Sequence, residues 1–467
     1  MDPTPNAEPR RDQGRSPGAV LLVSTYELGR EPLGLAWPMA FLARAGIGAR
    51  ALDLAVDTLD AAAVREARLV AFSVPMHTAL RLATRTARRV RELNPRAHVC
   101  FFGLYALLNA EYLLRELADS VLGGECEETL VALVADLASG GRGRVAGVRT
   151  RDQAASPVLN HLDFPPPDRT GLGPLERYAR LEVGAETRLA AAVEASRGCL
   201  HLCSHCPIPP VYGGRFFAVP VETVVSDVRA LVARGARHLS YADADFLNGP
   251  THALRVARAV HTEFPELSFD FTAKVEHLVR HRALLAELRE LGGLFAVSAF
   301  ESLSDKVLAA LVKGHTRADL YLALRVAREA GLTLRPTFVA FTPWTTLADY
   351  LAMLEFVERE GLVDHVDPVQ YGLRLLVPPG SLLLASAELK PYLGALEEET
   401  LSHFWRHTDT RVDALQGVVA ALVAEASQLG EDAEITFLRV KLAALEAARE
   451  ERRGRARPPR LSEDWFC

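Results

Sequence analysis

Three cysteines in one short segment are the residues whose spacing says most about chemistry. Cys199, Cys203 and Cys206 follow the pattern C-x3-C-x2-C. Iron–sulfur clusters are normally held by four cysteine thiolates. Three thiolates therefore predict a [4Fe–4S] cluster in which one iron has no cysteine ligand and is open to another molecule.

Two other interpretations of these cysteines are weaker. A structural zinc site needs four ligands; His201 or His205 could supply one, but the usual second Cys or His pair is absent nearby. A disulfide needs an oxidising compartment and would leave one of the three cysteines unpaired.

The segment from Ser196 to Pro207 closely resembles the cluster loop of radical S-adenosylmethionine (SAM) enzymes. The resemblance covers roughly residues 18–380, most strongly 190–345. It implies that the amino and carboxylate groups of SAM occupy the open iron. It also implies that reduction of the cluster cleaves SAM to methionine and a 5′-deoxyadenosyl radical, or prepares a methyl transfer.

The chain around this loop has the pattern of alternating strands and helices. We expect strands at 189–195, 237–242, 267–272, 294–300, 332–340 and 366–376, separated by helices at 220–233, 250–263, 277–291, 303–311, 317–330 and 346–360. This series predicts a partial, TIM-like (β/α)6 barrel over residues 189–380, with its chemistry at the carboxyl ends of the strands.

Acidic and basic residues follow the second and third of these strands. The resemblance implies that Asp243 or Asp245 holds the ammonium group of SAM, although turn and helix-cap residues would look the same. Lys274 and Glu276 are expected to be polar groups of the same pocket, or else a solvated ion pair.

The later strands carry a second group of candidates. Ser298 matches the position that contacts the SAM carboxylate or ribose in the family, and Glu301 would face the same opening. Arg335 and Thr337 end near the segment that seats the adenine. Arg374 could bind a substrate carboxylate through its planar fork, or form an internal ion pair.

Residues 18–139 alternate in the same way. Apolar runs at 19–24, 49–54, 69–74, 97–103 and 120–124 predict a doubly wound, parallel, Rossmann-like sheet. Ligands of such sheets lie beyond the carboxyl ends of the strands.

This region resembles the cobalamin-binding domain that precedes many radical SAM cores, through residues 28–36, 73–78 and 123–127. The resemblance implies a bound cobalamin near Thr78, Gly123 and Glu125. The motif Asp-x-His-x-x-Gly, whose histidine ligates cobalt in other cobalamin proteins, is absent. We therefore expect no protein nitrogen on cobalt, and interpret His77 as a residue that starts a helix.

The remaining segments carry less information. We expect a disordered lead at 1–17, an inter-domain linker at 140–188, and a helical region with a tail at 381–467. Cys467 is an exposed thiol that could reach an active site or a redox partner. The ending resembles the start of the Cys-Cys-Ala-Glu-Pro or Cys-selenocysteine-Ala-Glu-Pro tail of one radical SAM group. A selenocysteine codon read as a stop would end the chain there; a fortuitous cysteine is the alternative.

Composition narrows the classes of protein. The 467 residues carry a net charge of −6 and no long basic run, which argues against a general nucleic-acid binder. No apolar run suggests a membrane span, and the N-terminus has no signal-peptide pattern. With six cysteines, three of them in one motif, we expect a reducing cytoplasm.

The favoured activity is cobalamin-dependent methyl transfer to a carbon or phosphorus centre of a small molecule or peptide, with an electron donor such as flavodoxin or ferredoxin. A radical rearrangement, a cyclisation, or sulfur or selenium chemistry is the alternative within enzymes. Methylthio transfer to tRNA is less favoured. A non-catalytic electron-transfer or scaffold protein is the alternative of another class.

Overall fold

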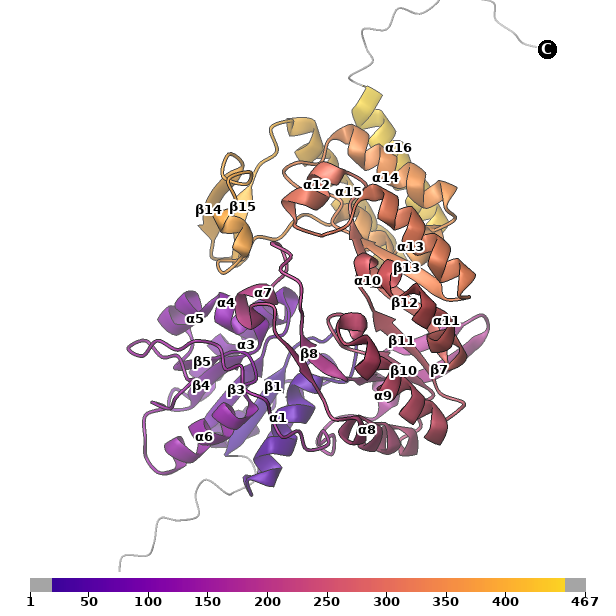
Figure 1. Ribbon diagram of the computed structural model, residues 1–467. Coiled ribbons are helices and arrows are strands. Elements are labelled where there is room, and N and C mark those ends of the chain that lie inside the picture. Colours follow the sequence, from indigo (N-terminus) through magenta and orange to yellow (C-terminus); the bar gives the residue numbers. More distant parts are fainter. Residues whose placement is uncertain (1–18, 450–467) are drawn as a thin grey trace, which may run out of the picture. The chain divides into compact units, whose positions relative to one another are not determined.

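A computed structural model describes residues 19–449 (Figure 1). The chain forms two compact units. The first runs up to Ala299 and also contains Ala310–Leu334 and Leu376–Phe404. The second contains Phe300–Ala309, Arg335–Leu375 and the chain from Trp405 onward.

The first region of the chain is built on a five-stranded parallel sheet. Its strands are β1 (Val20–Ser24), β2 (Arg50–Asp53), β3 (Leu69–Ser73), β4 (His98–Phe102) and β5 (Ser120–Leu122). They lie in the order β2-β1-β3-β4-β5. This is the flavodoxin-like order, in which ligands bind where the winding reverses, between β1 and β3.

Helices cover both faces of this sheet. They are α1 (Leu33–Arg44), α2 (Ala61–Glu66), α3 (His77–Leu93), α4 (Leu104–Leu108), α5 (Ala110–Glu116) and α6 (Glu127–Ala138). Leu35 and Leu42 of α1 share one core with Leu130 and Leu133 of α6. Residues of α2 to α5 form the core on the other face. The predicted doubly wound sheet is therefore confirmed.

A six-stranded sheet follows. Its strands are β6 (Arg180–Val183), β7 (Glu186–Val193), β10 (His238–Tyr241), β11 (Ser268–Thr272), β12 (Gly293–Glu301) and β13 (Thr333–Phe338). They lie in the order β13-β12-β11-β10-β7-β6. Strands β7, β10, β11 and β12 pair in parallel, as expected for an open half-barrel.

The helices between these strands match the predicted positions. They are α8 (Val221–Ala233), α9 (Pro250–Glu263), α10 (Val275–Arg280), α11 (Arg282–Glu290), α12 (Asp305–Ala310), α13 (Arg317–Glu329) and α14 (Leu347–Arg359). Between β7 and α8 lie a short antiparallel pair, β8 (Ser196–Gly198) and β9 (Phe216–Ala218), and the helix α7 (Pro209–Tyr212).

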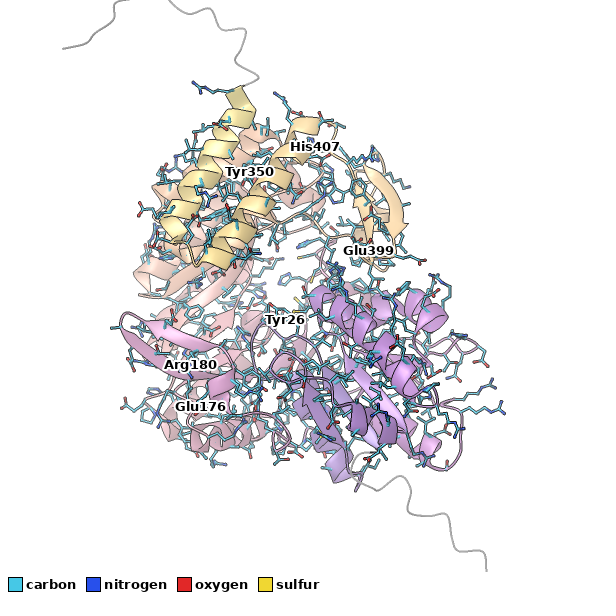
Figure 2. The ribbon with its side chains drawn as sticks, turned by 180° about the vertical axis from the view of Figure 1, so that it is seen from behind. Tyr26, Glu176, Arg180, Tyr350, Glu399 and His407 are labelled. Atoms are coloured by element: carbon cyan, nitrogen blue, oxygen red, sulfur yellow. The ribbon has the colours of Figure 1, made fainter. Side chains whose placement is uncertain are left out.

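The strand expected at 366–376 does not form. Pro368 instead begins the 3-10 turn η4 (Pro368–Gly372), because proline cannot donate a hydrogen bond to a sheet. Only an isolated bridge joins Arg374 to Phe341. The edge of the sheet comes from the expected linker, whose residues form β6, antiparallel to β7. Figure 2 labels Arg180, at the start of this edge strand.

The last described segments are β14 (Leu393–Glu397), β15 (Ser402–Trp405), α15 (Thr410–Leu429) and α16 (Ala433–Arg449). The helical C-terminal region is thus confirmed. By length and a mean hydropathy of 1.2, α15 passes a composition test for crossing a membrane. Helices of other kinds pass the same test, so this is weak support for a membrane span.

Candidate active site

The three cysteines lie on one loop, between β8 and α7, and the hairpin β8–β9 holds the start of this loop. Gly198 has a φ of +77°, and a Cβ there would lie 2.3 Å from the carbonyl oxygen of Arg215. Cys199 N–H donates to the same carbonyl at 3.0 Å. Only glycine therefore allows the chain to turn here without strain.

The far side of the loop is also fixed. The N–H of Ser204 donates to Leu311 O at 3.1 Å, and its hydroxyl donates to Ala310 O at the same distance. Cys206 N–H donates to Cys203 O at 3.2 Å. Hydrogen bonds to the backbone thus position the loop in the absence of any metal.

The three thiols form no disulfide. Burial raises the pKa of Cys206 to about 12, and its neighbours Cys203 and Cys199 contribute to the increase. Iron coordination removes such a proton, because a thiol bound to a metal is deprotonated. Three converging thiols with no other covalent partner fit a [4Fe–4S] cluster.

Asn248 contributes to this loop, although its sequence context suggested only a turn. Its Oδ1 accepts a hydrogen bond from Leu200 N–H at 3.2 Å and lies 3.8 Å from the Sγ of Cys199. Because Asn248 is in the turn η2 (Phe246–Asn248) after β10, it ties the loop to the end of a barrel strand. Its own position in the sequence gave no sign of this long-range contact.

Asp243 holds the strand that leads into the loop. It accepts hydrogen bonds from Ala195 N–H at 3.0 Å and from the hydroxyl of Ser196. Burial raises the pKa of Asp243 to about 7. Both oxygens of Asp243 are therefore engaged, and those of Asp245 contact Leu247 N–H at 3.1 Å and His277 Nδ1 at 2.7 Å. Which of the two binds the SAM ammonium stays a prediction.

Asp245 belongs to a buried polar chain beside the cysteine loop. Lys274 Nζ donates to Nδ1 of His201 at 2.9 Å, and lies 3.3 Å from Glu276 Oε2. Nε2 of His201 is 3.2 Å from Nε2 of His277, whose Nδ1 is 2.7 Å from Oδ2 of Asp245. The predicted residues Lys274, Glu276 and Asp245 are thus brought together.

The donor atoms of His201, Asp245 and His277 lie within 4.8 Å of one another, as in a site for a metal ion. Donation from Lys274 leaves the proton of a neutral His201 on Nε2, which then faces His277. These side chains consequently form an internal chain of polar contacts. In the sequence, His201 suggested a metal ligand because it lies between two cysteines, and His277, at the start of an expected helix, gave no signal.

The candidates on the later strands are more scattered. Ser298 is fully buried and lies on the same face of β12 as the buried Ala296, whereas Val297 on the opposite face is half-buried. Ser298 Oγ has no hydrogen-bond partner among the described residues. A contact between Ser298 and SAM stays a prediction. Ser298 would have to make this contact from the buried face of β12.

Glu301, Arg335 and Thr337 belong to the second unit. Glu301 has a φ of +62°, which is rare outside glycine, and its carbonyl accepts from Val339 N–H at 3.0 Å. Arg335 pairs with Asp367 at 2.9 Å near the surface. Thr337 is half-buried in β13. The predicted places of Glu301 at the opening of the SAM pocket, and of Arg335 and Thr337 near the adenine, stay predictions.

Arg374 forms the internal ion pair that was one of its two interpretations. Its Nη1 lies 2.8 Å from Oδ1 of Asp413, and its guanidinium carbon lies 3.5 Å from the ring centroid of Trp405. It also donates to the carbonyl of Trp405. These contacts favour a structural role over binding of a substrate carboxylate. Cys467 lies outside the described residues.

A cavity of about 350 Å³ opens at the carboxyl end of the first sheet, at its reversal point. The loop after β1 contributes Glu27 and Arg30, the loop after β3 contributes Pro75 and Met76, and α1 contributes Trp37. Figure 2 labels Tyr26, which belongs to the first of these loops.

Residues of the cysteine segment complete the cavity. Ser196, Arg197 and Gly198, directly before Cys199, line its other side, together with Ile208 and Tyr212. The cavity is therefore continuous with the strand that delivers the cluster loop.

The lining of this cavity is mostly apolar, with charged side chains that include Glu27, Arg30 and Arg197. A Cβ at Gly34 would lie 2.6 Å from Glu27 Oε1, so the backbone of α1 is as close to the cavity wall as glycine permits. No histidine is among the described residues that line the cavity; that no protein nitrogen binds cobalt stays a prediction. His77 instead begins α3, and its Nε2 is 2.7 Å from Thr400 O.

The predicted cobalamin contacts lie around this cavity and not in its lining. Thr78 is exposed on α3. Gly123 is buried against Leu107. Glu125 is fully buried and accepts from the hydroxyl of Tyr212 at 2.8 Å. Their contact with cobalamin stays a prediction.

Arg197 connects the two regions of the first unit. It pairs with Glu127 at 2.6 Å and Glu125 at 3.2 Å, from the end of the first sheet, and with Glu194 at 2.8 Å. Its guanidinium also lies over the ring of Trp37, at 5.2 Å from the centroid. The sequence gave only a weak indication of this role, because Arg197 is a single arginine between small residues ahead of the first cysteine.

Glu27 is a further residue that the sequence did not single out. It accepts from Gly34 N–H at 3.1 Å, near the N-terminus of α1. Burial, with smaller contributions from Asp53 and Glu194, raises the pKa of Glu27 to about 8. At neutral pH this carboxyl is therefore mostly protonated and can donate a hydrogen bond into the cavity.

A third arginine network joins the linker to both sheets. Arg169 pairs with Glu31 at 2.5 Å and with both oxygens of Asp227 at 2.8 and 2.9 Å, and it donates to Ala192 O at 2.8 Å. All three charged side chains are at most 4% exposed. Arg234 also binds Glu31, at 2.6 Å.

Comparison with known proteins accounts for both regions. Residues 193–357 match the radical SAM superfamily, and residues 19–134 match the B12 binding domain. An uncharacterized methyltransferase of Pyrococcus horikoshii is 23% identical over 58% of this chain and 60% of its own length. The hopanoid C-3 methylase of Methylococcus capsulatus is 25% identical over 69% of this chain and 64% of its own. The chain thus spans somewhat under two thirds of these curated relatives.

Solved structures share the fold. The cobalamin-dependent SAM radical enzyme OxsB with aqua-cobalamin aligns over 93% of this chain and 75% of its own, with a TM-score of 0.67 and 14% identity. The radical SAM methyltransferase TsrM from Kitasatospora setae, with cobalamin and a [4Fe–4S] cluster, aligns over 74% and 71%, with a TM-score of 0.57 and 18% identity. The chain thus carries a radical SAM domain over residues 193–357, preceded by a B12-binding domain over residues 19–134.

Proposed function

We propose that this chain is a cobalamin-dependent radical SAM enzyme that transfers a methyl group to a carbon or phosphorus centre of a small molecule or peptide. The observation that carries the proposal is the cavity at the reversal point of the B12-binding domain. Ser196, Arg197 and Gly198 line it and lead directly into Cys199. A cofactor in this cavity would be next to the cluster loop.

Cys199, Cys203 and Cys206 would hold the cluster, and SAM would take the open iron. When bound, the cluster supplies an electron for SAM cleavage and cobalamin carries a methyl group. The protein orients these groups and excludes water. Asp243 or Asp245 would hold the ammonium of SAM; Asp245 would exchange its contact with His277 Nδ1 for one with the ammonium.

The cavity residues have distinct tasks in this scheme. Trp37 and Met76 give it an apolar wall. Glu27, protonated at neutral pH, would donate a hydrogen bond to an amide or carbonyl of the bound cofactor. Arg197 fixes the wall to the cluster loop through its carboxylate partners.

The relatives support methyl transfer, since two are named as a methyltransferase and a methylase. Others are named as methylthiotransferases, such as the ribosomal protein uS12 enzyme RimO of Methylococcus capsulatus, 27% identical over 49% of this chain. The sequence ahead of the cluster loop has only Cys100 and Cys126, too few for a second three-cysteine cluster. Burial raises the pKa of Cys100 to about 12. Both observations disfavour methylthio transfer.

The test is anaerobic purification and reconstitution with iron, sulfide and hydroxocobalamin, followed by SAM and a chemical reductant. We expect retained iron and cobalamin after desalting, reductant-dependent 5′-deoxyadenosine, and S-adenosylhomocysteine whose formation requires cobalamin. Cys206→Ala should lose the iron, whereas Cys100→Ala, which removes a buried thiol outside the site, should keep it.

Two results would overturn the proposal in different ways. A SAM-responsive cluster without retained cobalamin would assign the first domain another role. Retained cobalamin and 5′-deoxyadenosine without S-adenosylhomocysteine would favour a radical rearrangement or ring closure. We also propose that the protein works in the cytoplasm and receives its electrons from a reductant such as flavodoxin or ferredoxin.

A further inference from the structure

Helix α16 has two apolar faces. Its inner face packs against α14 and α15 and consists of Thr436, Phe437, Val440 and Ala444. Its outer stripe consists of Ile435, Leu438, Leu442 and Leu445, which are 53%, 48%, 61% and 45% exposed. An amphipathic helix on a single core needs only one such face. The outer stripe is thus apolar surface that no described residue covers.

The spacing of the outer stripe is that of a coiled coil. Ile435 and Leu442 fall on positions a of a heptad, and Leu438 and Leu445 on positions d. Residues at these positions interlock with the same positions of a second helix. A β-branched residue at a, with leucine at d, favours two parallel strands.

The charges beside the stripe are complementary to themselves. In a parallel pair, position g of one helix faces position e of the next heptad on its partner. Glu434 at g would face Arg439, and Lys441 at g would face Glu446. Both pairs have opposite signs, so two copies of α16 attract each other in this orientation.

The same cations fix α16 to its own unit. Arg439 pairs with Glu425 at 2.5 Å and with Glu431 at 2.7 Å, and Lys441 pairs with Glu358 at 2.5 Å. These contacts tie both flanks of α16 to the neighbouring helices and leave the stripe directed outward. Ion pairs at the solvent-exposed edge of a helix pair favour one orientation of the two helices more than they increase the affinity.

We propose that the outer stripe of α16 binds the same stripe of a second copy of this chain, with the two helices parallel. A lipid surface would favour a uniformly basic edge beside the apolar stripe; Glu434 and Glu446 make this edge mixed in sign. The self-complementary charges therefore select a second copy over a membrane.

The test is the sedimentation behaviour of the full chain over a wide concentration range. We expect a dimer. Leu438→Glu combined with Leu442→Glu should weaken its dissociation constant by at least about 100-fold, because each buried leucine contributes about tenfold or more. Val183→Glu is the matched control, since Val183 is an apolar residue, 42% exposed, on β6. An unchanged circular dichroism spectrum and iron content show that each variant is folded.

Orientation is tested separately. Leu445→Cys should form an intermolecular disulfide, because position d meets itself only in a parallel pair. Glu446→Lys should weaken the dimer, and adding Lys441→Glu should restore it. A wild-type chain that stays monomeric overturns the proposal, including one that binds lipid vesicles or covers the stripe with its own residues 450–467. A dimer that the leucine substitutions leave intact overturns it equally.

Discussion

Replacing Arg169 with leucine should be among the most destabilising single changes in this chain. The substitution removes Arg169, the only side chain among residues 19–449 that forms an ion pair with Asp227, which is 4% exposed. Glu31 keeps a partner in Arg234. The main cost is therefore one buried carboxylate without a counter-charge, plus the lost hydrogen bond to Ala192 O.

The size of this destabilisation follows from the loss of one partner of a buried ion pair. Removing one partner of a buried ion pair costs about 3–5 kcal/mol. A cooperative unit of about 300 residues has an unfolding entropy of about 0.6 kcal/mol/K, so a loss of about 4 kcal/mol lowers the melting temperature by about 6 °C. Arg177→Leu is the control: its pair with Asp57 is about 40% exposed on both sides and should contribute at most about 1 kcal/mol.

The loss of stability in Arg169→Leu should depend on pH. Burial raises the pKa of Asp227, and Arg169 lowers it. Without the arginine, the folded variant holds a proton on Asp227 that the unfolded chain has released. Between the unfolded and folded pKa values, stability then falls as pH rises, by about 1.4 kcal/mol per unit. The deficit relative to the wild type should shrink on acidification.

Thermal melts of wild type, Arg169→Leu and Arg177→Leu at several pH values measure both effects. Adding Asp227→Leu to Arg169→Leu should recover part of the loss, because apolar residues can replace a buried pair. If Arg169→Leu melts within about 2 °C of the control, with no pH trend, the reasoning from buried charge is wrong.

Three further predictions concern single residues. Gly34→Ala places a Cβ 2.1 Å from Ser73 Oγ and 2.6 Å from Glu27 Oε1, so it should displace Glu27 and weaken cobalamin retention. Gly417→Ala, with nothing within 4 Å, should retain cobalamin and add about 0.5–1 kcal/mol of stability. The pKa of Glu27 rises from 4.5 to about 8 on folding, so wild-type stability should fall as pH rises between these values. Glu27→Gln should remove this pH dependence in thermal melts. Equal pH dependence of wild type and variant would contradict the raised pKa of Glu27. Arg374→Ala should lower the free energy of unfolding by about 1–2 kcal/mol, because it removes the ion pair with Asp413 and the contact with the ring of Trp405. SAM cleavage per folded molecule should not change. Loss of cleavage at unchanged stability would instead support a contact between Arg374 and the substrate.

Local patterns predicted the parts of this fold that depend on local physics. The strand expected at 19–24 is β1 (Val20–Ser24), and the three cysteines lie together on the loop that their spacing indicated. The expected strand at 366–376 failed because apolar content outweighed Pro368 in the prediction. The boundaries expected for the domains stay predictions.

Long-range partners are what the sequence could not supply. Arg169 is separated from Glu31 by 138 positions and from Asp227 by 58. Nothing in the turn-forming residues around it distinguishes a buried arginine from a solvated one. Periodicity identifies which face of an element is apolar, but not which distant charge will neutralise a cation buried beneath a loop.

The position of Arg197 makes the loading of the two cofactors a linked equilibrium. Its guanidinium lines the cobalamin cavity, and only Gly198 separates it from the first cluster cysteine. A cofactor that adds a contact to Arg197 further restrains the residue two positions before the first cluster cysteine, and so favours the loop conformation that binds the cluster. Thermodynamic reciprocity then requires the cluster to strengthen cobalamin binding by the same factor. Cells short of vitamin B12 would accordingly yield a chain poor in iron as well.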